Sequence, residues 1–152
     1  MEIKCKEFNT LTVEELYDLL QLRSEIFVVE QDCPYQDLDG IDKRCHHLLI
    51  YKESILQAYA RLIPEGLTFN EHSIGRVVTK NHGLGFGSTL MNEAIQSMYR
   101  IFGPIPIRIG AQTYATNFYT KFGFLPDGEV YDEDGIEHIE MILKLPLKVP
   151  VF

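Results

Sequence analysis

The sequence predicts a mixed α/β fold, in which a mostly antiparallel, twisted sheet of about six to seven strands carries helices on both faces. Short runs in which apolar and polar residues alternate, or which are rich in β-branched residues, indicate strands along the whole chain. Two long stretches with apolar residues at helical spacing indicate helices. The expected order is strand, helix and strands, then strand, helix, strand, helix and two strands. Because strands and helices do not alternate strictly, a doubly wound sheet is excluded. The 152 residues suit a single domain, residues 1–152.

The chain opens with a strand and a capped helix. Residues 2–8 alternate apolar and polar side chains, as a half-buried strand does. The Thr-Val-Glu-Glu at residues 12–15 matches a capping box, in which the Thr and Glu side chains satisfy amide donors at a helix start. The helix is expected to extend to about Ile26 or beyond, followed by a polar, turn-rich stretch at 31–40. Its apolar residues at helical spacing are Val13, Leu16, Leu20 and Phe27.

Three strands and a glycine-rich turn lead into a second helix. Residues 45–51, 55–63 and 73–79 are apolar runs, and the last of them, rich in β-branched residues, suits a buried strand. The turn at 82–88 is followed at once by a helix with one apolar stripe. A Gly-Pro pair at 103–104 ends this helix. The stripe consists of Phe86, Leu90, Met91, Ala94, Ile95, Met98 and Phe102.

The last third of the chain adds a strand, a short helix and a hairpin. The strand at 105–111 has Pro106 near its start, where the missing amide donor is tolerated. Residues 113–122 form the short helix. The apolar, proline-broken tail at 144–152 is expected to cover an edge strand or to dock on a neighbouring chain, as in a homodimer. The two strands of the hairpin flank an Asp-Glu-Asp-Gly turn and span residues 124–131 and 136–143.

Composition and charge exclude several classes of function. The chain has 14 Lys and Arg against 22 Asp and Glu, a formal net charge of −8, which disfavours nucleic acid and membrane surfaces as partners and favours a cationic one. No apolar run approaches the roughly 20 residues of a membrane helix, and the N-terminus lacks the apolar core of a signal peptide. Three cysteines without a Cys-x-x-Cys pair indicate neither a disulfide framework nor a zinc ribbon, so we expect a reducing, cytoplasmic location.

Two short segments imitate metal sites but lack the necessary ligand spacing. In the run Cys45, His46, His47, a strand turns the middle side chain away from its neighbours, and no second ligand pair has zinc spacing. The aspartates of residues 37–42 are similar to part of a twelve-residue calcium loop, which has a glycine at its sixth position. If Gly40 were that glycine, Tyr35 and His46 would occupy the first and last ligand positions, where such a loop has carboxylates. We therefore expect no metal.

The glycine-rich turn is the most informative segment, and it reads His82-Gly83-Leu84-Gly85-Phe86-Gly87. Such a turn at a helix start lets backbone N–H groups and the helix dipole hold an anion, typically a phosphate. The alternative is that the glycines serve only a tight turn. Ser88 stands where a Rossmann fingerprint has its third glycine, and the Gly-Lys-Ser/Thr of a P-loop is absent. A nicotinamide-dependent enzyme is therefore disfavoured.

A second motif follows the next strand: residues 112–124 form a short predicted helix that ends in Tyr-x-x-x-Gly-Phe. Together with the glycine-rich turn, it resembles the GNAT N-acetyltransferase superfamily. In that family a Gln/Arg-x-x-Gly-x-Gly/Ala loop binds the pyrophosphate of acetyl-coenzyme A, and a Tyr-x-x-x-Gly-Phe helix lies beside the thioester. Residues 27–40, which include Val-Glu-Gln-Asp-Cys-Pro-Tyr, are similar to the ElaA-type branch. The resemblance covers roughly residues 1–145.

The resemblance implies a site for acetyl-coenzyme A. The family's fourth and fifth strands run parallel and splay apart, so that pantetheine pairs with the end of the fourth strand, and Pro106 suits that splay. His82 replaces the family's Arg or Gln, so we expect backbone amides, with Lys80 or Arg76, to supply the missing attraction. The residues implied in binding are Val77, Val78, Thr79, His82, Gly83, Leu84, Gly85, Phe86, Gly87, Ser88, Gln112, Asn117 and Tyr119.

Acetyl transfer to an amine needs a base for the incoming ammonium and an acid for the leaving thiolate. Tyr119, in the family's position for this role, is the expected general acid. Glu30 is our first choice for the base, acting through a water or binding the ammonium electrostatically, and His138, His47 or water alone are the alternatives. Cys33 is interpreted as a small turn residue and not as a nucleophile.

The sequence thus predicts an N-acetyltransferase that acts by direct transfer, without a covalent enzyme intermediate. The alternative is a non-catalytic acyl-coenzyme A sensor or interaction module on the same fold. Peptide amines, polyamines and amino sugars all remain possible acceptors, because a fold does not determine a substrate. Acidic residues gather at 30–42 and 132–140, and the resemblance places the first group near the acceptor cleft. We therefore expect a cationic acceptor.

Overall fold

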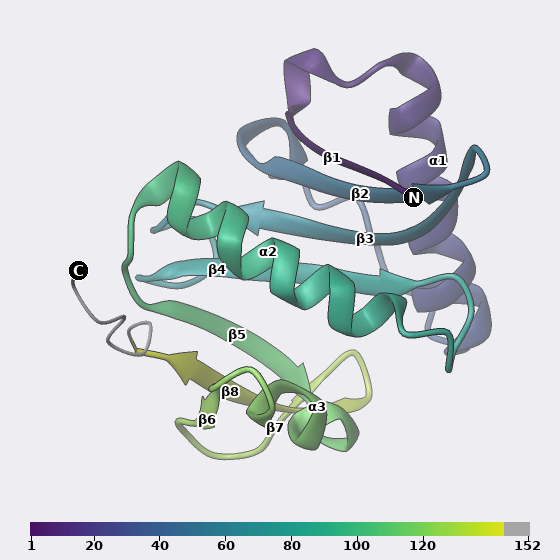
Figure 1. Cartoon of the computed structure of the whole chain (residues 1–152). Helices are drawn as coiled ribbons and strands as arrows, with labels where there is room; N and C mark the ends of the chain where they lie inside the picture. The colour runs from purple at the N-terminus through teal and green to yellow at the C-terminus, as the bar shows by residue number, and fades with distance from the viewer. Residues whose placement is uncertain (145–152) are drawn as a thin grey trace.

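One sheet of eight strands runs through the protein, with α2 on one face and α1 on the other (Figure 1). The strand order is β1-β2-β3-β4-β5-β8-β6, and β7 pairs with β8. The β4–β5 pair is parallel, and every other pairing within the described residues is antiparallel. The structure, a computed structural model, describes residues 1–144, so the predicted docking of the tail falls on residues outside the description. The predicted mixed sheet with helices on both faces is confirmed.

The bounds of the elements follow the predicted order. The strands are β1 (Glu2–Glu7), β2 (His46–Lys52), β3 (Ile55–Ile63), β4 (His72–Thr79), β5 (Ile107–Gln112), β6 (Leu125–Pro126), β7 (Tyr131–Glu133) and β8 (Ile136–Leu143). The helices are α1 (Val13–Arg23), α2 (Phe86–Phe102) and α3 (Thr116–Thr120), with a π-helical segment at Ser24–Glu30 and 3-10 turns at Phe8–Thr10, Asp42–Arg44 and Thr113–Ala115. No helix within residues 1–144 combines the length and the apolar character that crossing a bilayer requires.

The C-terminal hairpin accounts for the additional strand. The stretch expected as one strand at 124–131 is divided into β6 and β7, because Pro126 has no amide to donate and Gly128 adopts a φ of +130°. Both short strands then pair with β8. Asp134 and Gly135, with φ of +54° and +81°, form the tight turn, so the hairpin predicted there is confirmed.

α2 packs the predicted apolar stripe against the sheet. Leu90, Met91 and Ala94 are fully buried and belong to the larger core cluster, together with residues of β2, β3, β4 and β5. Burial of each large apolar side chain contributes about 1.5–3 kcal/mol. The helix ends at Gly103, which adopts a φ of +92°, as the Gly-Pro pair predicts. This packing fixes the position of the glycine-rich turn at the start of α2.

α1 begins as predicted, and its buried face agrees with the predicted stripe except at Val13. The Thr12 hydroxyl accepts a hydrogen bond from the Glu15 N–H at 3.0 Å and the Thr12 N–H donates to Glu15 Oε1 at 2.9 Å, which confirms the capping box. Glu15 also binds two lysines of β1, and this fixes the rotation of the helix. Leu19 and Leu22, one and two turns along the same face, are therefore buried, whereas Val13 is 85% exposed. The predicted stripe was wrong at Val13.

β4 and β5 diverge soon after they meet. Their pairing covers His72–Ile107 and Ser73–Arg108 and then ends, although β4 continues to Thr79. Pro106 directly precedes β5. The splayed parallel pair that the resemblance implies is thus confirmed, and the second half of β4 has a free edge toward β5.

A bulge bends β4 where this gap opens. Arg61 of β3 pairs with Gly75 and Tyr59 pairs with Val78, so β4 has one more residue than β3 between the two pairs. Arg76 lies in the bulge with a φ of +50°. Bulges commonly redirect side chains next to functional sites, and this one lies on the wall of the cavity described next.

Candidate active site

A cavity of about 980 Å³ opens where β4 and β5 diverge. Its walls include the π-helical segment, β3, β4, β5, α3 and the β7–β8 hairpin, and its volume is that of a small-molecule site. Asn117 is exposed on α3 and does not line the cavity, whereas the resemblance placed it against pantetheine. Gly83, Leu84, Gly85, Phe86 and Ser88 belong to the adjoining turn and the first turn of α2. The predicted residues that line the cavity are Glu30, Val77, Val78, Thr79, His82, Gly87, Gln112 and Tyr119.

The glycine-rich turn has the geometry of an anion site. Gly83 and Gly85 adopt φ of +80° and +81°, a conformation that L side chains rarely take. The first hydrogen bond of α2 runs from the Thr89 N–H to the Gly85 carbonyl. The N–H groups of the three residues between them therefore have no partner within the helix, and they lie at its positive end.

A side-chain pair links this turn to the π-helical segment. His82 Nε2 lies 3.0 Å from Glu30 Oε1, and both side chains are largely exposed. The other cations expected to assist the turn are engaged elsewhere, because Lys80 lies 3.7 Å from Glu25 and Arg76 binds Asp37. Within the described residues, the backbone N–H groups at the start of α2 are thus the donors of the turn that have no partner within the helix. Glu30, the predicted base, stands at the end of a π-helical segment, a feature frequent at functional sites.

Tyr119 lines the cavity from α3 among aromatic rings. Its ring packs edge-on against Phe118 and Phe124, with centroids 5.2 and 6.1 Å away. Burial raises the pKa of the Tyr119 hydroxyl well above its ordinary value, so the group stays protonated at neutral pH. The hydroxyl therefore holds a proton that it can donate.

The structure separates the two histidines considered as bases. His47 is fully buried, with one ring nitrogen 2.7 Å from the Tyr59 hydroxyl and the other 2.8 Å from the Asp42 carbonyl, and it does not line the cavity. Both of its nitrogens are occupied, so it cannot accept a proton from an acceptor. His138 lines the cavity from β8.

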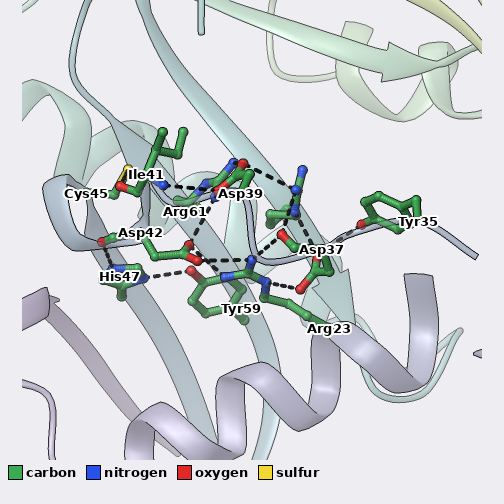
Figure 2. A network of polar contacts seen from close by, with 11 residues as sticks. Arg23, Tyr35, Asp37, Asp39, Ile41, Asp42, Cys45, His47, Tyr59 and Arg61 are labelled. Carbon is green, nitrogen blue, oxygen red and sulfur yellow. Dashed lines mark hydrogen bonds and ion pairs between the residues drawn. The ribbon is translucent and has the colours of Figure 1, made fainter. Parts of the chain in front are cut away.

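A network of arginine–aspartate ion pairs that the sequence did not predict joins α1 and the stretch after it to β3 (Figure 2). Three of its residues, Asp39, Arg61 and Arg76, line the cavity. We call it the arginine–aspartate network, and it consists of Arg23, Arg61, Arg76, Asp37, Asp39 and Asp42. Arg23, at the end of α1, binds Asp37 and Asp42 at 2.8 Å each. Arg61 of β3 binds Asp39 at 2.8 Å and Asp42 at 3.0 Å. The network thereby fastens the turn-rich stretch after α1 onto β3 and the bulge of β4.

The network changes the interpretation of the first acidic stretch. Burial raises the pKa of Asp39, but hydrogen bonds and the positive charge of Arg61 outweigh this effect and lower it to about 2. Its negative charge is thus balanced by Arg61. Asp37 and Asp42 likewise form ion pairs with arginines. The expectation that residues 30–42 present their acids to an acceptor was therefore wrong for these three. The carboxylates that line the cavity without an arginine partner, within the described residues, belong to Glu30, Glu133 and Asp134.

Two polar contacts join the walls of the cavity. The Gln31 and Gln112 side-chain amides exchange hydrogen bonds of 3.3 and 3.4 Å, and the Cys33 thiol donates to the Asp134 carbonyl at 3.3 Å. They connect the stretch after α1 with the end of β5 and with the hairpin turn. Cys33 is buried in a structural contact, in agreement with its interpretation as a turn residue.

Comparison with known proteins identifies the family. The family model described as an acetyltransferase (GNAT) domain matches residues 16–145. The chain belongs to the GNAT acetyltransferase family. Protein ElaA of Escherichia coli K12 is 44% identical over 137 residues, which cover 88% of this chain and 90% of that protein. The resemblance to the ElaA-type branch is thus confirmed.

Solved structures agree with this membership. The crystal structure of an acyl-CoA N-acyltransferase from Pseudomonas aeruginosa is 42% identical, covers 93% of this chain and 99% of its own, and superposes with a TM-score of 0.88. An aminoglycoside 6′-N-acetyltransferase complexed with coenzyme A shares the fold at 17% identity, with a TM-score of 0.71 and coverage of 99% and 100%. Membership of the GNAT family supports an acyl-coenzyme A-dependent acyltransferase activity.

The residues present fit the family's cofactor. A Cβ on Gly87 would lie 3.6 Å from the Phe118 ring and 3.9 Å from the Thr79 methyl group, so a side chain there would fill the space between α2, α3 and β4. Glycine keeps that space open next to the unpaired amides. Among residues 1–144, no group of three or more His, Cys, Asp or Glu side chains is arranged to hold a metal ion.

Proposed function

We propose that the protein transfers the acetyl group of acetyl-coenzyme A directly to a primary amine of a cationic small molecule or peptide. The observation that carries this proposal is the cavity between the diverging strands β4 and β5, lined by residues of the glycine-rich turn, by Tyr119 and by carboxylates that no arginine among residues 1–144 neutralises. The coenzyme A held by the aminoglycoside acetyltransferase of the same fold supports the choice of cofactor. Membership of the GNAT family supports an amine as acceptor.

The cofactor would be held mainly by backbone groups. The free edge of β4 at Val77, Val78 and Thr79 offers amide and carbonyl groups to pantetheine, because a strand edge pairs readily with an extended partner. The N–H groups at the start of α2 attract the pyrophosphate irrespective of net charge. The acidic composition of the chain is therefore compatible with an anionic cofactor.

Tyr119 is the proposed general acid. Acetyl-coenzyme A supplies a thioester whose sulfur leaves as a thiolate, and the Tyr119 hydroxyl donates a proton to that sulfur. Burial disfavours the tyrosinate, but the same apolar surroundings also disfavour a free thiolate. Proton transfer in step with departure of the sulfur avoids both charges.

Glu30, with the acids of the hairpin turn, is the proposed acceptor-binding group. Its carboxylate lies at the cavity, half-exposed and beside His82, where it can attract an ammonium group. Glu133 and Asp134, at the β7–β8 turn, add negative charge to another part of the cavity wall. A cationic amine is thus favoured over an anionic one.

The test is a free-thiol release assay with acetyl-coenzyme A and spermidine, glucosamine, a lysine-containing peptide and glutamate as acceptors. We expect thiol release with at least one of the three cationic amines, and the least with glutamate. Binding of coenzyme A without thiol release from any amine would replace the proposal with the non-catalytic sensor. Glutamate as the best acceptor would refute the cationic acceptor and leave acetyl transfer intact.

A further inference from the structure

The face of β5, β8 and β7 that borders the cavity carries a row of polar side chains. α1 packs on β3 and β4 of this sheet. In β5, β8 and β7, the strand register places one side chain of each strand in a common row. His138 of β8 pairs with Gln112 of β5 on one side and with Tyr131 of β7 on the other. All three residues line the cavity. Paired residues of antiparallel strands share a face, so this row forms one surface of the cavity.

His138 lies in the middle of this row with a fixed ring. It is 7% exposed, and its Nδ1 lies 2.8 Å from the Ile136 carbonyl. A carbonyl only accepts hydrogen bonds, so Nδ1 carries a proton, and the lone pair of the deprotonated ring lies on Nε2. The Tyr131 ring stacks on the imidazole, with centroids 5.7 Å apart and planes 27° apart. The ring is thus held in the tautomer that a base requires.

The other histidines of the described chain do not combine these properties. His47 has both nitrogens occupied, and His72 accepts a hydrogen bond from the Glu65 N–H and stacks on Phe102, away from the cavity. His82 is 76% exposed and pairs with Glu30. His46 does not line the cavity.

The groups that face His138 suit a base that gains and then loses a proton. Glu133 Oε2 of β7 lies 3.5 Å from Nε2, close enough to stabilise a positive imidazolium, and its side chain is 60% exposed, so a proton has a route to solvent. Gln112 of β5 and Tyr131 of β7 are neutral, and Gln31 reaches the row through its hydrogen bonds with Gln112. The charged neighbour is thus a carboxylate.

We propose that His138 is the general base of the reaction and that the acceptor amine lies on the surface formed by Gln112, His138 and Tyr131. This inference rests on the proposed acetyl transfer. His138 Nε2 takes one proton from the ammonium, and the freed lone pair forms a C–N bond with the thioester carbonyl carbon. The C–S bond breaks, its electron pair leaves on sulfur, and sulfur takes the Tyr119 proton.

The remaining proton transfers restore the residues. The nitrogen of the new amide gives its second proton to the Tyr119 oxygen, and the His138 proton leaves past Glu133 to solvent. The sum is an ammonium and a thioester converted to an amide, a thiol and one released proton. Glu30 then serves to attract the ammonium, while His138 deprotonates it.

The decisive variant is His138→Gln, which keeps a polar side chain of similar reach but cannot take a proton. With the best amine of the thiol-release panel, we expect kcat at pH 7 to fall by about 10²–10⁴-fold with an unchanged Kd for coenzyme A. The deficit should shrink as the pH rises toward 9.5, because a larger share of the amine arrives deprotonated. In His138→Ala, added imidazole should restore part of kcat without a change in thermal stability.

The matched control is His72→Gln, since His72 is also 7% exposed and does not line the cavity. We expect its kcat to stay within about twofold of the wild type, in line with the usual effect of changes away from the reacting groups. A His138→Gln enzyme that retains a third of the wild-type kcat, or a deficit that does not depend on pH, overturns the proposal.

A second substitution covers the case in which the His138 variants do not fold. Glu133→Gln changes an exposed side chain and should lower kcat several-fold with an unchanged Kd for coenzyme A, and an unchanged kcat would then overturn the proposal. Coenzyme A binding without thiol release by the wild type refutes the proposed function and this inference with it. Turnover that is insensitive to His138 refutes this inference alone.

Discussion

Substitution of Arg23 by Met tests whether the arginine–aspartate network stabilises the fold. The Arg23 side chain is fully buried and makes four hydrogen bonds of 2.8 to 3.3 Å, two to Asp37 and two to Asp42. Methionine has nearly the same length but no charge. Its introduction leaves two buried carboxylates with one arginine each, Asp37 with Arg76 and Asp42 with Arg61.

Removal of one partner from a buried ion pair costs about 3–5 kcal/mol, because the remaining charge is left poorly compensated. The retained arginines reduce this cost, so we expect a loss of about 3 kcal/mol in the free energy of unfolding. A domain of this size loses about 2–4 °C of Tm per kcal/mol, which corresponds to a fall of roughly 6–12 °C. Urea denaturation at pH 7, analysed with a constant m-value, measures the loss. Arg44→Met, at an exposed arginine of the neighbouring 3-10 turn, is the control and should stay within about 0.5 kcal/mol.

The pH dependence separates a charge effect from a packing effect. Burial raises the pKa of Asp42, but Arg23 and Arg61 outweigh it and hold the pKa below its ordinary value of 3.8. The stability from this depressed pKa is present above pH 3.8 and is lost as the pH falls through the folded-state pKa. The difference between the wild type and Arg23→Met should therefore decrease as the pH is lowered from 7 to 4, since protonation removes the uncompensated charge in the variant first. A loss below 1 kcal/mol at pH 7, or one that stays constant with pH, would refute this reasoning.

Four further changes test other parts of the structure. Tyr119→Phe should lower kcat by about 10²-fold or more with an unchanged Kd for coenzyme A, and equal kcat values would contradict the general acid. Gly85→Glu, at a φ of +81°, should abolish the thermal stabilisation that coenzyme A gives, and retained stabilisation would contradict the anion site. Glu15→Gln should flatten the fall in unfolding free energy between pH 4.5 and about 2, because burial raises the pKa of Glu15 but Lys6, the Thr12 amide and Lys4 lower it to about 2; a curve like that of the wild type would contradict this role. Leu19→Ala should cost about 2–5 kcal/mol in urea denaturation, while Val13→Ala, at an exposed position, should cost less than 0.5 kcal/mol.

Local patterns predicted the second half of the fold well. The apolar stripe of α2, its glycine start and its Gly-Pro end each depend on residues within a few positions of one another, and periodicity detects such patterns. The inward face of α1 was harder to predict, because it depends on the ion pairs that Glu15 makes with β1. Leu16, Leu20 and Phe27 of the predicted stripe do pack against the smaller core cluster, but the pattern omitted the buried Leu19 and Leu22 and included the exposed Val13.

The arginine–aspartate network was missed because it joins residues far apart in the sequence. Arg76 and Asp37 are 39 positions apart, and Arg61 and Asp42 are 19 apart. One signal was nevertheless present: Arg61 interrupts the buried apolar run that follows Gln57 in β3, where an arginine is tolerated only with acidic partners. A glycine at 75 inside the β4 run similarly indicates a bulge. Both signals show where a partner or an irregularity is needed, but neither identifies it.

The net charge of −8 has a different distribution from the one that the sequence suggested. Three aspartates of the first acidic stretch, the buried Asp37 and Asp42 and the exposed Asp39, form ion pairs with three arginines, so their charge is balanced by the protein itself. The carboxylates left at the cavity come from the end of the π-helical segment and from the β7–β8 hairpin, two segments held near each other by the Cys33–Asp134 contact. Transfer of an acetyl group from an anionic cofactor to an ammonium requires opposite local potentials within one cavity. Backbone amides at the start of α2 can provide the positive potential without cationic side chains. The carboxylates at the cavity can then provide the negative potential.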